Sequence, residues 1–139
     1  MAGLWHSARV TRFELPPPHP SAARIFAWVR MTGGHVDVRP EAIEIDYGWA
    51  FHAEIPRASI LAMVPEDGPV RRYGANRRGN LWSVVPDAVG LVRFTISPPA
   101  RGRLMYIPGK VKDLRLAVAD RDGFLAALGG PTGPAVSTG

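Results

Sequence analysis

The chain has 139 residues, of which 46% are hydrophobic and 21% charged, and it contains no cysteine. This length fits a single domain, and the ordinary composition excludes both a disordered chain and a membrane-embedded protein. The lack of cysteine excludes a disulfide framework and a thiolate zinc site. The net charge of +5 arises from 17 Lys and Arg against 12 acidic residues, which permits weak binding to polyanions.

We expect residues 1–24 to form a proline-rich strap, because "ELPPPHP" fixes the backbone in an extended polyproline II conformation. The next apolar segment, "AARIFAWVRM", fits either a short helix or a further strand. The chain does not open with a cationic segment followed by an unbroken apolar stretch, so we expect no secretory signal. Its longest apolar run, "ASILAMVP", is far shorter than the roughly 20 residues of a spanning helix. We therefore expect a cytoplasmic protein that touches a membrane at most peripherally.

Residues 25–129 are predicted to form one β domain, because apolar and polar residues alternate in short runs bounded by Gly, Pro and Asn. The runs predict seven antiparallel strands near 35–39, 42–46, 50–55, 60–64, 81–85, 89–97 and 113–119. After them, "DRDGFLAAL" predicts one α-helix with Asp120 as its N-cap and Phe124, Leu125 and Leu128 on one face. Residues 130–139 are rich in turn formers and predict a flexible tail.

The register of the first three strands follows from the requirement that apolar residues share one face. A two-residue turn at Pro40 and Glu41 places Asp37 opposite Glu44 and His35 opposite Asp46. A three-residue loop of Tyr47, Gly48 and Trp49 then leads into the third strand, with glycine available for a left-handed position.

The outward face of these strands gathers histidines and carboxylates, which are ligands for divalent metals. Its members are His35, Asp37, Glu44, Asp46, His52 and Glu54. A metal-dependent enzyme or a small-ligand-cavity protein using this His/carboxylate face is therefore the alternative function. Polar residues on a solvated sheet are its ordinary explanation. Since the chain also lacks a G-x-S-x-G elbow, we expect no enzyme activity and no cofactor.

The order of elements resembles the pleckstrin-homology-like (PH-like) architecture, a bent sheet or partial barrel capped by one C-terminal helix. The blocks "YGWAFHAEIPRASI", "RRGNLW", "GLVRFTISPP" and "DRDGFLAAL" resemble an uncharacterised family of small actinobacterial proteins with a PH-like domain, over about residues 35–128. The resemblance implies a fold and a binding role. The basic loop of phosphoinositide-binding members lies between their first two strands, and here that loop is only "PE", so their lipid site is not carried over.

Two basic segments without acids flank the strands at 81–85 and 89–97. If these strands pair as a hairpin through "PDA", the segments "VRRYGANRRGN" and "SPPARGRLMYIPGKVK" emerge at the same end of the sheet. Together they supply the candidate anion-binding residues Arg71, Arg72, Arg77, Arg78, Arg101, Arg103, Lys110 and Lys112. The first segment lacks the Lys-Ser/Thr pair of a P-loop, so a diffuse anion site is expected.

The same segments contain Tyr73, Leu104, Met105 and Tyr106, which either insert into a membrane or stack on nucleic acid, or fold back on the core. Nucleic acid is the weaker candidate, because Phe51 and Phe94 fall on predicted buried faces and leave no stacking platform. We therefore expect a non-catalytic binding or scaffolding module. Its basic end would contact an acidic protein partner or an anionic lipid or phosphate.

Overall fold

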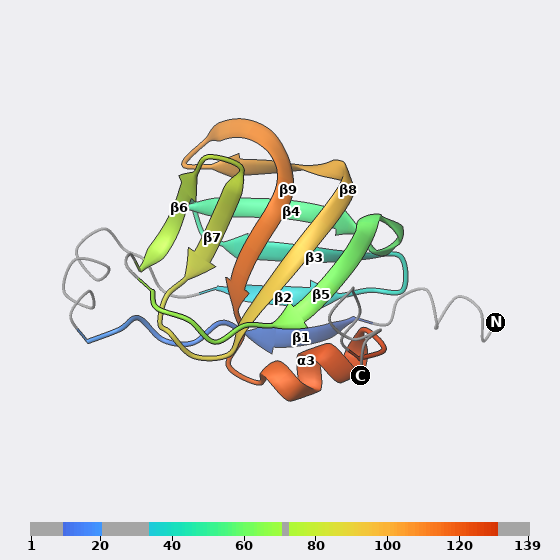
Figure 1. Cartoon of the computed structure of the whole chain (residues 1–139), viewed down its shortest axis with the longest axis horizontal. Helices are drawn as coiled ribbons and strands as arrows, with labels where there is room; N and C mark the ends of the chain where they lie inside the picture. The colour runs from blue at the N-terminus through green and yellow to red at the C-terminus, as the bar shows by residue number, and fades with distance from the viewer. Residues whose placement is uncertain (1–9, 21–33, 71–72, 131–139) are drawn as a thin grey trace.

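The computed structural model describes residues 10–20, 34–70 and 73–130, which consist mainly of β-strands (Figure 1). The strands of these residues are β1 (Thr11–Glu14), β2 (His35–Val38), β3 (Ala42–Tyr47), β4 (Phe51–Pro56), β5 (Ile60–Pro65), β6 (Gly74–Arg78), β7 (Leu81–Val85), β8 (Leu91–Leu104) and β9 (Ile107–Ala117). A 3-10 turn, η1 (Arg57–Ser59), follows β4, and the α-helix α3 (Arg121–Ala127) follows β9. The prediction of a mainly β domain ending in one helix is confirmed. The segment "AARIFAWVRM", Arg71, Arg72 and residues 131–139 lie outside the described residues.

The strands form one sheet in the order β1-β2-β3-β4-β8-β9-β7-β6, with β5 paired to β8 beside this path. The long strand β8 belongs to two layers, because it pairs with β5 over residues 92–96 and with β4 over residues 102–104. In Figure 1 the layer of β5, β8, β9, β7 and β6 crosses in front of the layer of β1 to β4. The sheet is thus folded over on itself without closing, since β1 and β6 stand at its two ends.

The core lies between the two layers. Ile45 of the rear layer and Trp82 and Phe94 of the front layer are almost completely buried. Helix α3 covers one open end, where the Phe124 ring meets Phe13 and Phe94 edge to face, with centroids 5.6 and 6.1 Å apart. Burial of each large apolar side chain contributes about 1.5 to 3 kcal/mol, so these contacts hold the helix against the sheet.

The start of α3 is the one predicted from the sequence. The Asp120 carboxylate accepts a 3.1 Å hydrogen bond from the backbone N–H of Gly123. This bond satisfies one of the amides that the first turn of a helix leaves free. Phe124 and Leu125 are buried and Leu128 packs against the core, so the predicted apolar face is confirmed.

The register of β2 and β3 is also confirmed. His35 pairs with Asp46, and Asp37 pairs with Glu44. A 2.9 Å backbone hydrogen bond donated by Arg39 closes the two-residue turn between the strands. The polar side chains therefore share the outward face, as the apolar pattern required.

The next loop contains three residues but starts one position later than predicted. Tyr47 pairs with Phe51, so the loop consists of Gly48, Trp49 and Ala50. Because the aromatic ring of Tyr47 is buried, β3 continues one residue further than predicted and ends at Tyr47. Gly48 adopts the expected left-handed conformation, with φ of 59°.

The predicted strand number and the pairing of residues 81–97 were wrong. The described residues form nine strands instead of seven, since β1 and β6 are additional, and β7 and β9 run parallel. β7 and β8 do not pair with each other; β9 lies between them, antiparallel to β8. The physical reason is burial: Leu114 and Leu116 of β9 are completely buried in a strand with partners on both sides, whereas a local hairpin would have left β9 at an edge.

Part of the predicted proline-rich strap belongs to the sheet. β1 pairs with β2 along the sheet edge, and Leu15 after it is buried. Further along, the His19 amide donates a 2.9 Å hydrogen bond to the Pro86 carbonyl, and the His19 ring stacks on Tyr73 with centroids 4.4 Å apart. β1, from the predicted strap, is therefore part of the same sheet as the strands predicted for residues 25–129.

Candidate anion-binding surface

The predicted loop between residues 97 and 112 is instead a two-stranded ribbon formed by the ends of β8 and β9. Its pairs run from Ala100 opposite Val111 to Leu104 opposite Ile107. Successive residues alternate between its two faces, so the inward positions Ala100, Gly102 and Val111 are buried. The basic residues occupy the intervening, exposed positions Arg101, Arg103, Lys110 and Lys112.

Two further predicted basic residues lie on β6, beside the ribbon. The Arg77 guanidinium stands over the Trp82 ring at 4.8 Å from its centroid. A Cβ added at Gly109 would lie 3.4 Å from Arg77 Nη1, which shows how closely Arg77 approaches β9. Arg78 pairs with Leu81 at the turn into β7.

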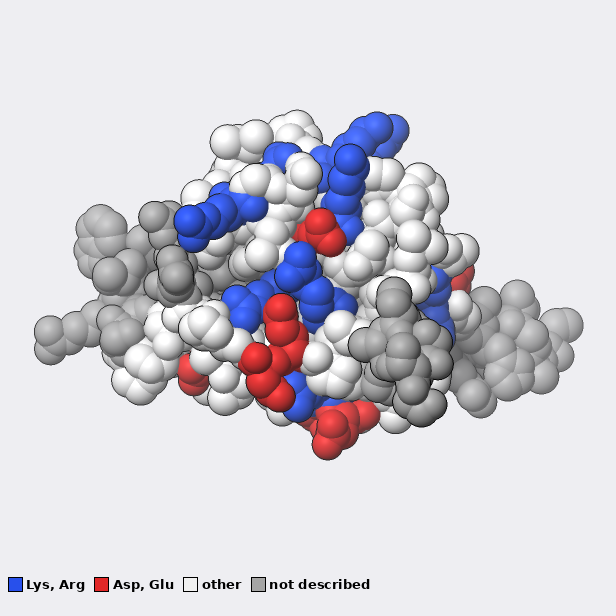
Figure 2. Space-filling model, in the orientation of Figure 1, with Lys and Arg blue, Asp and Glu red and all other residues white. Residues whose placement is uncertain are grey.

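The pairing across β9 explains why the two basic segments meet although β7 and β8 are not neighbours. Leu81 at the start of β7 pairs with Asp113 of β9, and Asp113 pairs with Thr95 of β8. The entry to β7 and the continuation of β8 are therefore at the same end of the front layer. Figure 2 shows Lys and Arg side chains in the upper part of this face, while most of its acidic side chains lie lower. We call the six described residues Arg77, Arg78, Arg101, Arg103, Lys110 and Lys112 the basic surface.

Ion pairing separates the basic surface from all the other described arginines except Arg57, which bonds a backbone carbonyl. Within the described part of the chain, none of its six members forms an ion pair. By contrast, Arg115 Nε lies 2.7 Å from Glu66 Oε2, and Arg12 Nε lies 2.8 Å from Asp37 Oδ1. The remaining arginines with acidic partners are Arg39, Arg93 and Arg121. The basic surface therefore presents charge that the described residues do not neutralise.

Repulsion within the ribbon adds to this imbalance. Arg101 and Lys110 are directly opposed across the two strands. Directly opposed like charges destabilise a strand pair by up to about 1 kcal/mol, and a bound anion would relieve that cost.

The tip of the ribbon is apolar and exposed. Met105, Tyr106 and Ile107, which we call the tip, are 47%, 70% and 69% exposed. Met105 and Tyr106 form the turn with φ values of 48° and 71°. A 2.9 Å hydrogen bond from the Met105 amide to the Ala50 carbonyl fixes the turn against the β3–β4 loop.

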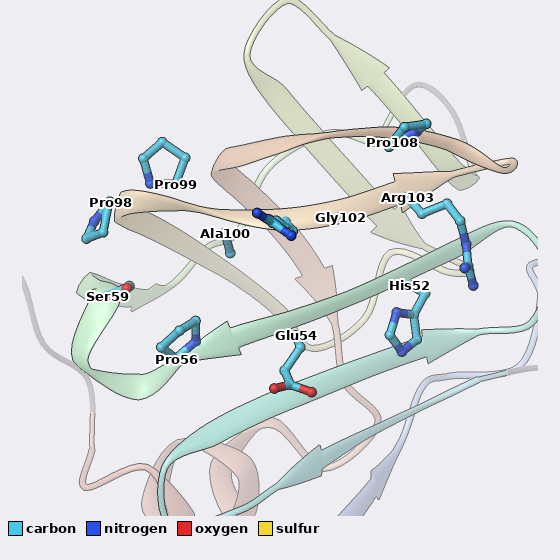
Figure 3. Close-up of a pocket in the computed structure, with 11 residues that line it drawn as sticks. His52, Glu54, Pro56, Ser59, Pro98, Pro99, Ala100, Gly102, Arg103 and Pro108 are labelled. Atoms are coloured by element: carbon cyan, nitrogen blue, oxygen red, sulfur yellow. The ribbon is translucent and has the colours of Figure 1, made fainter.

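A shallow groove of about 590 Å³ runs beside the ribbon (Figure 3). It arises because the pairing of β4 with β8 ends at Ala53 and Gly102, after which the two strands diverge. Prolines 56, 98, 99 and 108 line it together with His52, Glu54, Arg101 and Arg103. The groove thus joins an apolar lining to the edge of the basic surface.

The side chains of the His/carboxylate face are already engaged in hydrogen bonds and ion pairs. Glu44 receives His52 Nε2 at 2.9 Å on one oxygen and Arg39 Nη2 at 3.3 Å on the other. A hydrogen bond from Arg12 holds the pKa of Asp37 below its usual value. Among the residues that the structure describes, no three or more His, Cys, Asp or Glu side chains are grouped as metal ligands would be.

The sequence prediction missed two features of these surfaces. Arg12, which neutralises Asp37, belongs to the predicted strap, so its proximity depended on the unpredicted strand β1. Ile107 was not recognised as part of the exposed tip. The alternation of Arg101 and Arg103 with small residues was the available signal for a strand there.

The chain matches no protein-family model, no curated protein and no solved structure. In the described ranges, no helix has both the length and the apolar character needed to cross a bilayer.

Proposed function

We propose that this domain is a non-catalytic binding module that docks on an anionic macromolecular surface through its basic surface. The observation that carries the proposal is the difference in ion pairing between the basic surface and the other arginines. Five of the six other described arginines are held by acids and the sixth, Arg57, bonds the Arg39 carbonyl, whereas the six of the basic surface have no acidic partner within the described residues. Four of them project from the same face of one ribbon. A regular array of this kind presents its charge to a broad partner.

The strength of such docking follows from the number of cations. Each Lys or Arg near an anionic membrane contributes about 1 kcal/mol, so six contribute about 6 kcal/mol. That energy corresponds to a dissociation constant of the order of tens of micromolar. Exposed charges are screened over about 10 Å at 0.1 M salt, so binding is expected to weaken as salt rises. Arginine forks suit both phosphate and carboxylate oxygens.

The proposal includes a PH-like relationship for the fold. A bent sheet followed by a C-terminal helix that covers one open end supports it. The nine strands and the parallel pair of β7 and β9 depart from the seven-stranded antiparallel pattern. The binding role therefore depends on the basic surface itself and takes no residue from any PH-like ligand site.

The His/carboxylate face has weaker support as the functional site. A metal would have to displace Arg39 or His52 from Glu44, or Arg12 from Asp37. Stacking of nucleic acid bases on the sheet is also disfavoured, because Phe51 and Phe94 are buried as predicted. An acidic protein and an anionic bilayer are the two partners that suit the basic surface.

The test uses two anionic probes, namely vesicles of equal parts phosphatidylglycerol and phosphatidylcholine, and labelled polyglutamate. Vesicle sedimentation and fluorescence anisotropy measure the two affinities at low and high salt. Replacing Lys110 and Lys112 by Gln should weaken binding about 30-fold, because about 2 kcal/mol is lost.

The matched control carries Ala88→Glu and Val89→Glu, which lower the net charge by the same two units. Both residues are exposed in the loop that precedes β8, at the other end of this strand from the tip. The control should retain nearly wild-type affinity. Binding to neither probe, or equal losses of affinity in the lysine variant and the control, would contradict the proposal.

A further inference from the structure

The exposed tip is not explained by the folding of the domain. Met105, Tyr106 and Ile107 are consecutive, and each leaves about half or more of its surface exposed. Isolated exposed apolar residues, such as Leu61, are ordinary on protein surfaces. Three adjacent ones at the end of the ribbon form a patch of the kind that marks an interaction site.

The backbone of the tip supports the same conclusion. Both central residues of the turn have positive φ, a conformation that favours Asn and Gly and penalises larger side chains. The chain has Met and Tyr there instead. Residues in this conformation cluster at functional sites, which agrees with a role of these apolar side chains outside the fold.

The cations are placed at fixed distances behind the tip. A strand advances about 3.3 Å per residue, so Arg103 lies roughly 7 Å and Arg101 roughly 13 Å along the ribbon from Met105. Lys110 is opposite Arg101. The apolar tip therefore comes first. Arg103 follows within the thickness of a lipid headgroup layer, roughly 5 to 8 Å on each side of a bilayer, and Arg101 and Lys110 stand farther out.

We propose that the tip inserts into the interfacial region of an anionic bilayer while Arg103 binds the lipid phosphates and Arg101 and Lys110, farther from the tip, are attracted to the same anionic surface. This inference rests on the proposed function and names the bilayer as the anionic partner. An acidic protein face would satisfy the cations but leave the tip in water. A bilayer places an apolar layer directly beneath its anionic surface, and tyrosine suits that boundary because its ring is apolar and its hydroxyl polar.

The chain contains no cysteine, so a single introduced thiol can carry a label without competition. In Tyr106→Cys labelled with an environment-sensitive nitrobenzoxadiazole dye, addition of the phosphatidylglycerol vesicles should shift the emission to the blue and raise it several-fold. The same dye on Val89→Cys, at the other end of β8, should not respond. Equal responses at both positions, or no response at position 106 while the protein sediments with the vesicles, would overturn insertion.

A double variant separates insertion from charge. Tyr106→Ser with Ile107→Ser should lower vesicle affinity about tenfold or more, because two apolar side chains no longer leave water, and should leave polyglutamate binding unchanged. Arg101→Gln with Lys110→Gln should weaken both. If the serine variant binds vesicles as tightly as the wild type, insertion is refuted while docking through charge stands. If the wild type binds polyglutamate but not vesicles, the bilayer is the wrong partner, and if it binds neither probe, both proposals fail.

Discussion

The loop before β8 contains a glycine whose replacement should be unusually costly. Gly90 has φ of 62°, and a Cβ there would overlap the carbonyl oxygen of Val118 and lie 2.9 Å from its carbonyl carbon. The two residues are already joined by a 2.9 Å hydrogen bond from the Val118 amide to the Gly90 carbonyl. Backbone on both sides is therefore fixed and cannot move aside cheaply.

For Gly90→Ala, the left-handed conformation costs roughly 1 to 2 kcal/mol and the overpacking roughly 1 to 3 kcal/mol. The free energy of unfolding should fall by roughly 2 to 5 kcal/mol, a large share of the roughly 5 to 15 kcal/mol of a typical domain. Urea denaturation followed by far-ultraviolet circular dichroism measures this loss.

Gly48→Ala is the matched control. Gly48 has almost the same φ, 59°, but a Cβ there would meet nothing within 4 Å. The free energy of unfolding of this variant should therefore fall only by the cost of the left-handed conformation, roughly 1 to 2 kcal/mol. Equal losses for the two variants would refute the argument that the close approach to Val118 makes glycine necessary at position 90.

Two further predictions concern buried polar groups. Burial raises the pKa of Tyr47 to about 12, and its hydroxyl has no hydrogen-bond partner in the described part of the chain, so Tyr47→Phe should raise the free energy of unfolding by about 1 kcal/mol. Because the pKa of Tyr47 is higher in the folded state, ionisation of its hydroxyl favours unfolding of the wild type between pH 10 and about 12. The variant should therefore unfold less readily in this range in a spectroscopic pH titration. The pKa of Asp37 is lowered by the hydrogen bond from Arg12, so its stabilisation is present above the ordinary value of 3.8 and is lost as the pH falls below it. Arg12→Gln should reduce this acid sensitivity, and an unchanged acid transition would contradict the assignment.

Local patterns were sufficient for much of the rear layer and for the helix. The register of β2 and β3 follows from apolar alternation, because a slip of one residue would have moved Ile43 and Ile45 to the solvent. Asp120 could be identified as the N-cap of α3 because capping is decided by residues close in sequence. The loop after Tyr47 was predicted one residue too early, because the burial of the Tyr47 ring depends on contacts with the other layer.

Features set by distant contacts could not be predicted in the same way. The hairpin expected between 81–85 and 89–97 is the local solution, and only the burial of Leu114 and Leu116 favours β9 between the two strands. The meeting of the basic segments was expected from that hairpin, whereas the structure achieves it through the pairs that Asp113 makes on both sides. The exposure of the tip could not be predicted, because it depends on the ribbon formed by β8 and β9. The prolines at 98, 99 and 108 had indicated a loop in this segment.

The sharing of β8 by both layers has a mechanical consequence. Residues at one end of this strand pack beneath α3, while those at the other carry the tip. A load applied to the tip is therefore passed along the continuous backbone of β8 into the centre of the molecule.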